Sequence, residues 1–420
     1  MFVVLTILRT LVVKILTYSK IMINIKNILF LLFCFTLLNC KSAKKTELPT
    51  LKAITTGAER TELYLEKLKG KSVGLVVNQT SVVGNEHLVD FLLNQKINVK
   101  KIFAPEHGFR GELPAGEQID DSKDSKTGLP IVSLHGNKFK PNETDLKDLD
   151  ILIFDIQDVG VRFYTYISTL TYVMEACAEN NKKLIVLDRP NPNGNYIDGP
   201  VLDTQFRSFV GIAPIPVVHG LTIGEFALMS NGEQWLSNRM KCDLEIIPCA
   251  KYTHADYYEL KIPPSPNLRT MRAILLYPSI CFFEGTTVSL GRGTANPFEV
   301  AGHPALKGKY SYSFKPQPNS ASGNPPQNGK VCYGVTFSEM SKEKLFDRKR
   351  LDFKYLLDFY PSINSKEPYF LKNNFFDRLA GTDKFRKEII SGKSEEEIRK
   401  SWEPELEKYR TMRKKYLLYP

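Results

Sequence analysis

Apolar and polar positions alternate along residues 60–210 in a pattern that predicts strands and helices in turn. Short apolar runs bounded by polar residues predict buried strands at 72–77, 101–104, 130–134, 150–156 and 183–187. Helical spacing of apolar residues predicts helices at 61–69, 88–93 and 165–180. Continuous apolar strands that alternate with helices are typical of a parallel sheet covered on both faces. The pattern therefore predicts a doubly wound, Rossmann-like α/β domain over 60–210.

The second half of the chain is less regular and is richer in proline and aromatic residues. Residues 262–267 (IPPSPN) predict an extended loop, because each proline fixes its own φ and restricts the residue before it. Residues 315–330 have the composition of a loop or linker, and 375–409 have a helical pattern. We expect a second, smaller α/β domain over 211–420.

The N-terminal segment has the pattern of an export signal. Residues 1–40 contain four basic residues and no acidic one, and 28–38 (ILFLLFCFTLL) form an apolar run. Leu-Leu-Asn-Cys at 37–40 resembles a lipobox, with Cys40 as the lipid anchor, and the polar residues 41–59 are typical of a tether. The alternative is an uncleaved membrane anchor, for which the apolar run is short. The prediction is an exported lipoprotein at the periplasmic face of a membrane.

Charge and cysteine usage exclude several classes of protein. The net charge of +11 falls to +7 without residues 1–40, and no basic stripe is interleaved with aromatic residues, so nucleic acid is a poor partner. Five scattered cysteines follow Cys40, without a CxxC pair, which argues against a disulfide framework or structural zinc. Cys242 and Cys249 either pair or remain free thiols.

Motifs of several common enzyme classes are absent from the sequence. No GxGxxG follows the first strand, so we expect no dinucleotide cofactor, and no GxxxxGK[ST] or GxSxG occurs. No HExxH occurs either, and we expect neither a cofactor nor a metal. A site formed by His107 with Asp158 and Glu106 is the metal-binding alternative.

Polar residues are concentrated where three predicted strands end. The segments 104–111, 157–164 and 188–194 are rich in Glu, His, Asp, Arg, Asn and Tyr, and each has Gly or Pro to set its shape. Ligands of open α/β sheets bind beyond the carboxyl ends of the strands. The turns at the other ends, such as 94–100, are ordinary. This asymmetry predicts a catalytic cleft.

Glu106 is the first candidate for catalysis. It lies between Pro105 and Gly108, where a carboxylic acid is well placed to protonate a leaving-group oxygen; the alternative is a salt bridge to Arg110. His107 either orients Glu106 or has a structural role. Asp158, in the loop, is a better candidate than Asp155, for which we expect a bracing role at the sheet edge.

Further candidates are divided between catalysis and binding. Tyr164 and Glu284 are the other catalytic candidates, with loop bracing as the alternative for each. Polar residues on or near the same loops are candidates for substrate binding, with arginine suited to a carboxylate: Arg110, Arg162, Asp188, Arg189, Asn191, Asn193, His219, Asn267 and Arg292. Loop bracing is the equal alternative for Arg162 and Arg189, and His219 alternatively belongs to the start of a helix.

Five motifs in order resemble the NamZ/YbbC family, long catalogued as a domain of unknown function. They are APEHGFRGELPAGE (104–117), DIQDVGVRFYTYISTL (155–170), LDRPNPNGNYIDGP (187–200), PPSPN (263–267) and FEGTTVSLGRGT (283–294). The resemblance implies a Rossmann-like domain joined to a smaller α/β domain, with the active site in the cleft between them. It also implies an exo-acting β-N-acetylmuramidase that releases N-acetylmuramic acid from the non-reducing ends of peptidoglycan fragments. The glutamate of the PEHG motif, a catalytic candidate in the family, corresponds to Glu106.

The substrate that the resemblance implies suits these residues. The lactyl carboxylate of a muramyl sugar would pair with Arg110, Arg162, Arg189 or Arg292. Its acetamido group allows substrate-assisted catalysis, with Asp158 or Tyr164 positioning that group and Glu106 as the acid. In a two-carboxylate mechanism the pair would be Glu106 and Glu284. The alternatives are a non-catalytic sugar-binding lipoprotein and a cell-wall amidase or esterase that uses His107 and Asp158.

Overall fold

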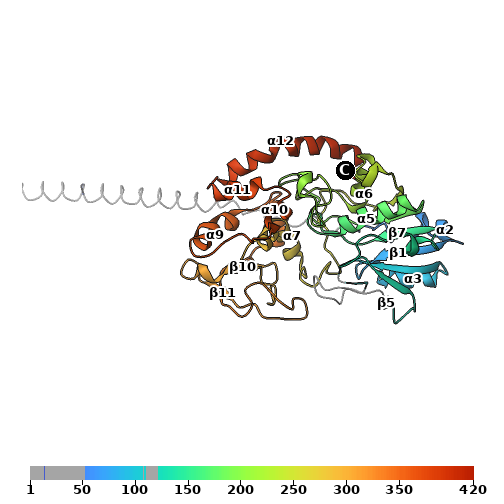
Figure 1. The fold of residues 1–420 in the computed structure, drawn as a ribbon, viewed down its shortest axis with the longest axis horizontal. Helices are drawn as coiled ribbons and strands as arrows, with labels where there is room; N and C mark the ends of the chain where they lie inside the picture. The colour runs from blue at the N-terminus through green and yellow to red at the C-terminus, as the bar shows by residue number, and fades with distance from the viewer. Residues whose placement is uncertain (1–13, 15–52, 107, 110–121) are drawn as a thin grey trace, which may run out of the picture. The chain divides into compact units, whose positions relative to one another are not determined.

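A seven-stranded sheet forms the centre of the N-terminal part of the protein (Figure 1). The computed structural model describes residues 14, 53–106, 108–109 and 122–420. The strand order is β5-β6-β4-β1-β7-β8-β9, and every neighbouring pair is parallel except β5 and β6. The strands are β1 (Ser72–Val77), β4 (Asn98–Ala104), β5 (Ser122–Lys123), β6 (Pro130–Ser133), β7 (Ile151–Asp155), β8 (Lys183–Leu187) and β9 (Asp243–Ile247). The predicted parallel-sheet α/β fold is confirmed.

Side chains alternate between two hydrophobic cores on opposite faces of the sheet. In β1, Val73 and Leu75 pack in one core beneath α2 (Leu65–Leu68) and α3 (Leu88–Asn94). Val76 enters the other core, under α5 (Tyr166–Glu179) and α6 (Ile223–Gly232). Figure 1 shows α3 and α5 on opposite sides of the strands. This double cover explains why the strands are continuous apolar runs in the sequence.

Gly74 interrupts the apolar run of β1 at a position where side chains from neighbouring segments pack against the backbone. A Cβ at this position would lie 2.7 Å from the Leu149 Cδ1 atom and 3.1 Å from the Phe103 ring. A larger residue at position 74 would therefore require the side chains of Leu149 and Phe103 to shift.

The helices begin at residues that the sequence marks as caps. Thr222 and Glu225 form a reciprocal capping box at the start of α6, and Ser394 and Glu397 form another at α12 (Glu395–Arg413). Asn142 and Asp145 do the same for α4 (Glu143–Leu146). A predicted helix at 61–69 is instead a 3₁₀ turn, η1 (Thr61–Leu63), followed by α2.

The C-terminal part is a second, smaller domain of helices around an antiparallel sheet. The sheet has the order β10-β12-β11, from β10 (Val300–His303), β11 (Tyr312–Phe314) and β12 (Cys332–Thr336). The helices are α7 (Met271–Ile280), α8 (Lys342–Asp347), α9 (Lys354–Asn364), α10 (Phe375–Ala380), α11 (Lys384–Ile390) and α12. The central sheet takes β9 from beyond residue 210, because β9 pairs along its full length with β8.

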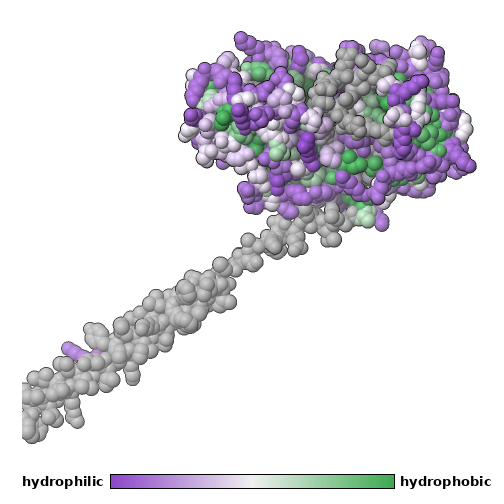
Figure 2. Space-filling view, turned by 90° about the horizontal axis from the view of Figure 1, so that it is seen from below, coloured by the Kyte–Doolittle hydropathy of each residue, from purple (hydrophilic) through white to green (hydrophobic). Residues whose placement is uncertain are grey.

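The remaining short elements complete the chain. A two-stranded ribbon pairs β2 (Val82–Val83) with β3 (Glu86–His87). Single 3₁₀ turns form η2 (Thr204–Phe206), η3 (Ser237–Arg239), η4 (Cys281–Gly285), η5 (Pro304–Leu306) and η6 (Lys414–Tyr416). Figure 2 shows one face of the protein, on which hydrophilic residues surround smaller hydrophobic patches.

Three further predictions concern the N-terminal signal and tether, a membrane anchor, and the pairing of Cys242 with Cys249. Cys40 and most of the predicted signal peptide and tether lie outside the described residues. No helix in the described part is both long and apolar enough to cross a membrane. Cys242 and Cys249 are free and buried, and the neighbouring Cys242 thiol together with burial raises the pKa of Cys177.

Candidate active site

A cavity of ≈ 150 Å³ lies beyond the carboxyl ends of β4 and β7. These two strands flank β1, which is the point where the strand order reverses and where α/β sheets bind ligands. The second domain closes the cavity from the other side through α7 and η4. Five predicted site residues line it: Glu106, Tyr164, Asn267, Glu284 and Arg292. Segments almost 190 residues apart in the sequence thus converge, as a cleft between two domains requires.

Glu106 reaches the cavity from the turn that follows β4. Its Oε2 atom lies 3.4 Å from the Thr165 hydroxyl, which stands at the N-terminus of α5. Gly108, two residues after Glu106, has a φ of +77°, which glycine adopts without strain and which allows the chain to turn there. The carboxyl group is half-buried, so it contacts both the protein and the space where a substrate would bind.

Tyr164 supplies a hydroxyl that the fold leaves unused. Its ring packs edge-on against Tyr166 and Tyr277, at centroid distances of 5.0 and 5.8 Å. The hydroxyl is buried and forms no hydrogen bond of acceptable geometry in the described part of the chain. Burial raises the pKa of Tyr164 well above its usual value, so the group remains a hydrogen-bond donor. Buried polar groups without a partner are rare in native proteins, and Tyr164 belongs to the cavity lining, which makes its hydroxyl a candidate for a ligand contact.

Replacing Tyr164 with Phe should lower activity without lowering stability. The variant removes a buried hydroxyl that has no protein partner, so its free energy of unfolding should be unchanged or slightly higher. If the hydroxyl binds substrate, kcat/KM should fall about 10-fold to 100-fold, the effect of losing one or two good hydrogen bonds. Chemical denaturation and steady-state kinetics measure the two effects. A Tyr172→Phe variant, in the middle of α5 and outside the cavity lining, is the matched control.

Glu284 and Arg292 form an ion pair in the wall of the cavity. The Nε and Nη2 atoms of Arg292 lie 2.8 and 2.7 Å from Glu284 Oε1, and both side chains are about one-fifth exposed. The Cys281 thiol donates to the other carboxylate oxygen at 3.4 Å. The guanidinium carbon lies 4.8 Å from the centroid of the Phe298 ring. The pair places a negative and a positive group together at the substrate-facing surface.

Asp158 lies behind the cavity and does not line it. Its Oδ2 atom accepts a hydrogen bond of 2.7 Å from the Gly160 amide, whereas Oδ1 is buried without a partner among the described residues. Burial raises the pKa of Asp158 to about 7, against the hydrogen bonds from the backbone. The carboxyl group acts on the pKa of Tyr164, so it is close enough to influence the site.

Because the pKa of Asp158 is raised in the folded protein, stability should depend on pH through this group. In the folded protein the Asp158 carboxyl group stays protonated up to about pH 7, whereas in the unfolded chain it loses its proton near pH 4. The folded state therefore binds more protons between these pH values, and the free energy of unfolding falls as pH rises through them. Asp158→Asn should remove this loss of stability, because an amide does not titrate. The difference in unfolding free energy between the variant and the parent should therefore favour the variant more at pH 8 than at pH 5. Denaturant unfolding at both pH values tests this. Asp347→Asn, at an exposed residue that ends α8, serves as the control, and equal pH slopes in the parent and Asp158→Asn would contradict the prediction.

Arg162 is buried away from the cavity and acts as a brace. Its guanidinium donates to the backbone carbonyls of Pro200, Ile215 and Leu379 at 2.7 to 2.9 Å. It is fully buried, and burial lowers its pKa to about 9. The structure therefore gives this side chain three protein partners and no exposure to a substrate, in contrast to the predicted binding role.

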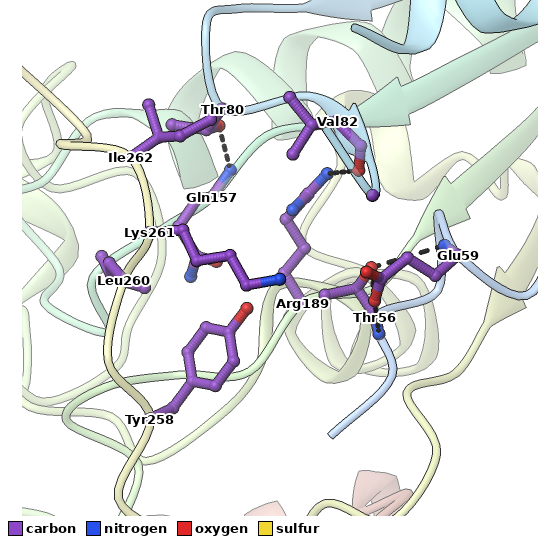
Figure 3. A pocket seen from close by; sticks show the side chains of 11 residues that line it. Thr56, Glu59, Thr80, Val82, Gln157, Arg189, Tyr258, Leu260, Lys261 and Ile262 are labelled. Carbon is purple, nitrogen blue, oxygen red and sulfur yellow. Dashed lines mark hydrogen bonds between the residues drawn. The ribbon is translucent and has the colours of Figure 1, made fainter. Parts of the chain in front are cut away.

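Arg189 lies in a separate small cavity beside the ends of β7 and β8 (Figure 3). It forms a two-pronged ion pair with buried Asp155, with distances of 2.6 and 2.9 Å, and also donates to the Val82 carbonyl at 3.2 Å. Figure 3 shows Gln157 and Tyr258 near it. The cavity volume of ≈ 30 Å³ is that of about one water molecule, too small for a sugar. Asp155 braces the sheet edge, as the sequence predicts.

Asp188 and His219 are also buried outside the cavity. Asp188 accepts hydrogen bonds from the Tyr419 hydroxyl at 2.6 Å and from the Thr222 hydroxyl at 2.7 Å, and burial raises its pKa to about 6. His219 accepts from the Leu221 amide at 3.1 Å, and burial lowers its pKa to about 3. Asp188 joins the loop after β8 to Thr222 and Tyr419, whereas the His219 ring bonds within its own turn, and neither residue lines the cavity.

Asn191 and Asn193 lock the loop that follows β8. Asn193 donates to the carbonyls of Val159 and Ile274, at 2.9 and 3.3 Å, and Asn191 donates to the Leu221 carbonyl at 2.8 Å. The Asn191 side-chain amide also occupies the space that a Cβ atom at position 160 would need, so only glycine fits there. Neither residue lines the cavity. His107 and Arg110 lie outside the described residues, so their predicted roles stay predictions.

Several residues that line the cavity were not predicted from the sequence as site residues. They are Phe163, Thr165, Tyr166, Val210, Ser265, Leu268, Tyr277 and Phe298. Tyr166 follows Tyr164 by two residues in the motif at 155–170, which is a usable signal. Tyr277 belongs to an apolar helix face and has no signal in a single sequence. In the described part of the chain, no group of three His, Cys, Asp or Glu residues is placed to hold a metal ion.

The arrangement is that of an enzyme that hydrolyses carbohydrates. Two carboxyl groups, several hydroxyls and aromatic rings line one cavity at the edge of a parallel sheet, and most glycoside hydrolases use a pair of carboxyl groups. Two family models of the exo-β-N-acetylmuramidase NamZ match the chain, the N-terminal one at residues 73–272 and the C-terminal one at 275–419. The chain belongs to the NamZ family and is a glycoside hydrolase, which confirms the resemblance in the motifs.

Comparisons with individual proteins agree with this assignment. The chain is 40% identical over 379 residues to the peptidoglycan β-N-acetylmuramidase NamZ of Bacillus subtilis (strain 168), covering 85% of this chain and 89% of that protein. It is 50% identical to a crystal structure of a DUF1343 family protein from Bacteroides fragilis NCTC 9343, with a TM-score of 0.81 over 88% of this chain and 99% of that one. A second DUF1343 structure from the same organism is 31% identical, with a TM-score of 0.70 over 87% and 99%.

Proposed function

We propose that this protein is an exo-acting muramidase that releases N-acetylmuramic acid from the non-reducing ends of peptidoglycan fragments, with Glu106 as the general acid. The observation that carries the proposal is the convergence of Glu106, Tyr164 and the Glu284–Arg292 pair on one cavity in a chain of this family. The B. subtilis relative is named for peptidoglycan β-N-acetylmuramidase activity.

Each side chain has a role that its environment supports. Glu106, half-buried beside the Thr165 hydroxyl, protonates the leaving oxygen. The buried hydroxyl of Tyr164 donates a hydrogen bond to the acetamido group of the muramyl residue and positions that group beside the anomeric carbon for substrate-assisted catalysis. Arg292 pairs with the lactyl carboxylate, for which a guanidinium is the best donor, and Glu284 keeps it aimed at the cavity.

The test uses the purified protein, a chromogenic β-N-acetylmuraminide and defined peptidoglycan fragments. We expect release of the chromogenic group and stepwise appearance of free N-acetylmuramic acid, with no internal cleavage of the glycan chain. Internal fragments, tight binding without release, or cleavage of amide or ester bonds alone would each reject the proposal. The second and third results would favour a sugar-binding protein and an amidase or esterase respectively.

We also propose that the protein is exported and held at the periplasmic face of a membrane by a lipid on Cys40. The support is the basic, then apolar, segment that ends in Leu-Leu-Asn-Cys at 37–40. Cys40→Ala should move the protein from the membrane to the soluble fraction of cells and abolish incorporation of labelled fatty acid. Unchanged labelling and fractionation would reject the anchor.

A further inference from the structure

A second cavity, of ≈ 320 Å³, lies among the C-terminal helices and shares no lining residue with the candidate active site. Its walls come from residues 200–203, from Thr382 with α11, and from α12. In Figure 1, α11 lies at the left of the folded protein and α12 runs along its top, whereas β5 lies at the lower right. The volume is within the usual range of small-molecule sites, about 300–1,000 Å³.

The cavity has an aromatic floor and a polar rim. Trp402 and Phe385 are 5% and 1% exposed, and their rings pack edge to face at 5.5 Å and 88°. Asp203, Lys384 and Glu405 are exposed at the rim. An apolar floor with a few polar groups above it is the usual composition of a site for a small ligand with both apolar and polar faces. A pyranose ring has that character, because its C–H groups cluster on one face and its hydroxyls lie around the edge.

Hydrogen-bonding groups at this cavity are not all used by the protein. The Trp402 indole N–H is buried and has no acceptor in the described part of the chain, although buried tryptophan usually finds one. The carboxylate of Glu388 accepts from Ser401 at 3.2 Å and from Lys393 at 3.1 Å, which leaves lone pairs for a ligand hydroxyl. A ligand with both acceptors and hydroxyl donors would satisfy these groups.

The charges in the lining disfavour an anionic ligand. Three carboxylates, of Asp203, Glu388 and Glu405, stand against the single ammonium of Lys384. The lysines that pair with Glu388 and Glu405, Lys393 and Lys408, do not line the cavity. Counted with these lysines the charges balance, so the cavity offers no net positive charge to a lactyl carboxylate, whereas its carboxylate oxygens can accept from the hydroxyls of a neutral N-acetylhexosamine.

We propose that this cavity is a second sugar site, which binds a neutral N-acetylhexosamine such as N-acetylglucosamine. The inference stands on this cavity alone and does not need Glu106 to be catalytic. In the context of the proposed function, the two cavities would bind the anionic and the neutral sugars of an alternating glycan chain.

The chain has two tryptophans, Trp235 and Trp402, which makes a direct binding test possible. In a Trp235→Phe variant, Trp402 is the only tryptophan and reports on this cavity. Titration with N,N′-diacetylchitobiose should give a saturable change in its emission at millimolar concentrations. Adding Asp203→Ala should weaken the binding about tenfold, as expected for the loss of a hydrogen bond to a charged group.

Controls separate this site from the catalytic one. Asp148→Ala, at an exposed carboxylate that the cavity does not include, should leave the titration unchanged. Asp203→Ala should retain the parent rate on the chromogenic muraminide, which shows that the variant is folded. No change in emission up to about 10 mM sugar, an equal response with Asp203→Ala, or a response only to muramic acid or an alkylammonium ion would overturn the proposal. A failure of muramidase activity leaves this titration interpretable.

Discussion

Replacing Glu106 with Gln should lower the rate of release of N-acetylmuramic acid from a natural disaccharide by about 10²–10⁴-fold, the usual contribution of a general acid. The amide has nearly the same shape as the carboxyl group, so the contact with Thr165 can persist while the transferable proton is lost. The rate should fall less for a nitrophenyl muraminide, because its leaving group needs little protonation. Steady-state kinetics on both substrates measures the difference.

The matched control is Glu396→Gln, an exposed glutamate in the first turn of α12. It should have the parent rate and stability. Glu106→Gln itself should unfold at the same denaturant concentration as the parent. Similar losses on both substrates would argue against proton donation, and full activity of Glu106→Gln would exclude Glu106 from catalysis.

Replacing Arg189 with Met should lower the free energy of unfolding by about 3–5 kcal/mol, because it leaves Asp155 buried without a countercharge. Asp155 is fully buried, and its two oxygens accept from Arg189 at 2.6 and 2.9 Å. The double variant Asp155→Asn/Arg189→Met removes both charges and should recover much of the loss. Denaturant unfolding of the parent, the two single variants and the double variant gives the coupling energy.

Arg239→Met, at an exposed arginine, should change stability by no more than about 0.5 kcal/mol. The same experiment distinguishes a brace from a substrate contact. Arg189→Met should retain the parent KM under conditions where it is folded. A large rise in KM with unchanged stability would instead support the binding role that the sequence suggests.

Local sequence patterns predicted the architecture of the N-terminal domain well. The runs at 72–77 and 183–187 coincide with β1 and β8, and the helix expected at 165–180 is α5 within one residue at each end. These patterns depend on side-chain periods of two and 3.6 residues, which are properties of consecutive residues. The rule for strand ends similarly placed Glu106 and Tyr164 beside one another, since it requires only the direction of the strands.

Which polar side chains face the substrate was settled by contacts between distant parts of the chain. Arg162 looked like a carboxylate-binding residue from its loop, but one of its three acceptors is the carbonyl of Leu379, 217 residues away. Asp188 is likewise occupied by Tyr419, 231 residues later. A polar residue at a strand end either binds a ligand or satisfies a buried partner, and both uses select the same residue types. The difference lies in burial and in the partner, which only the folded chain brings together.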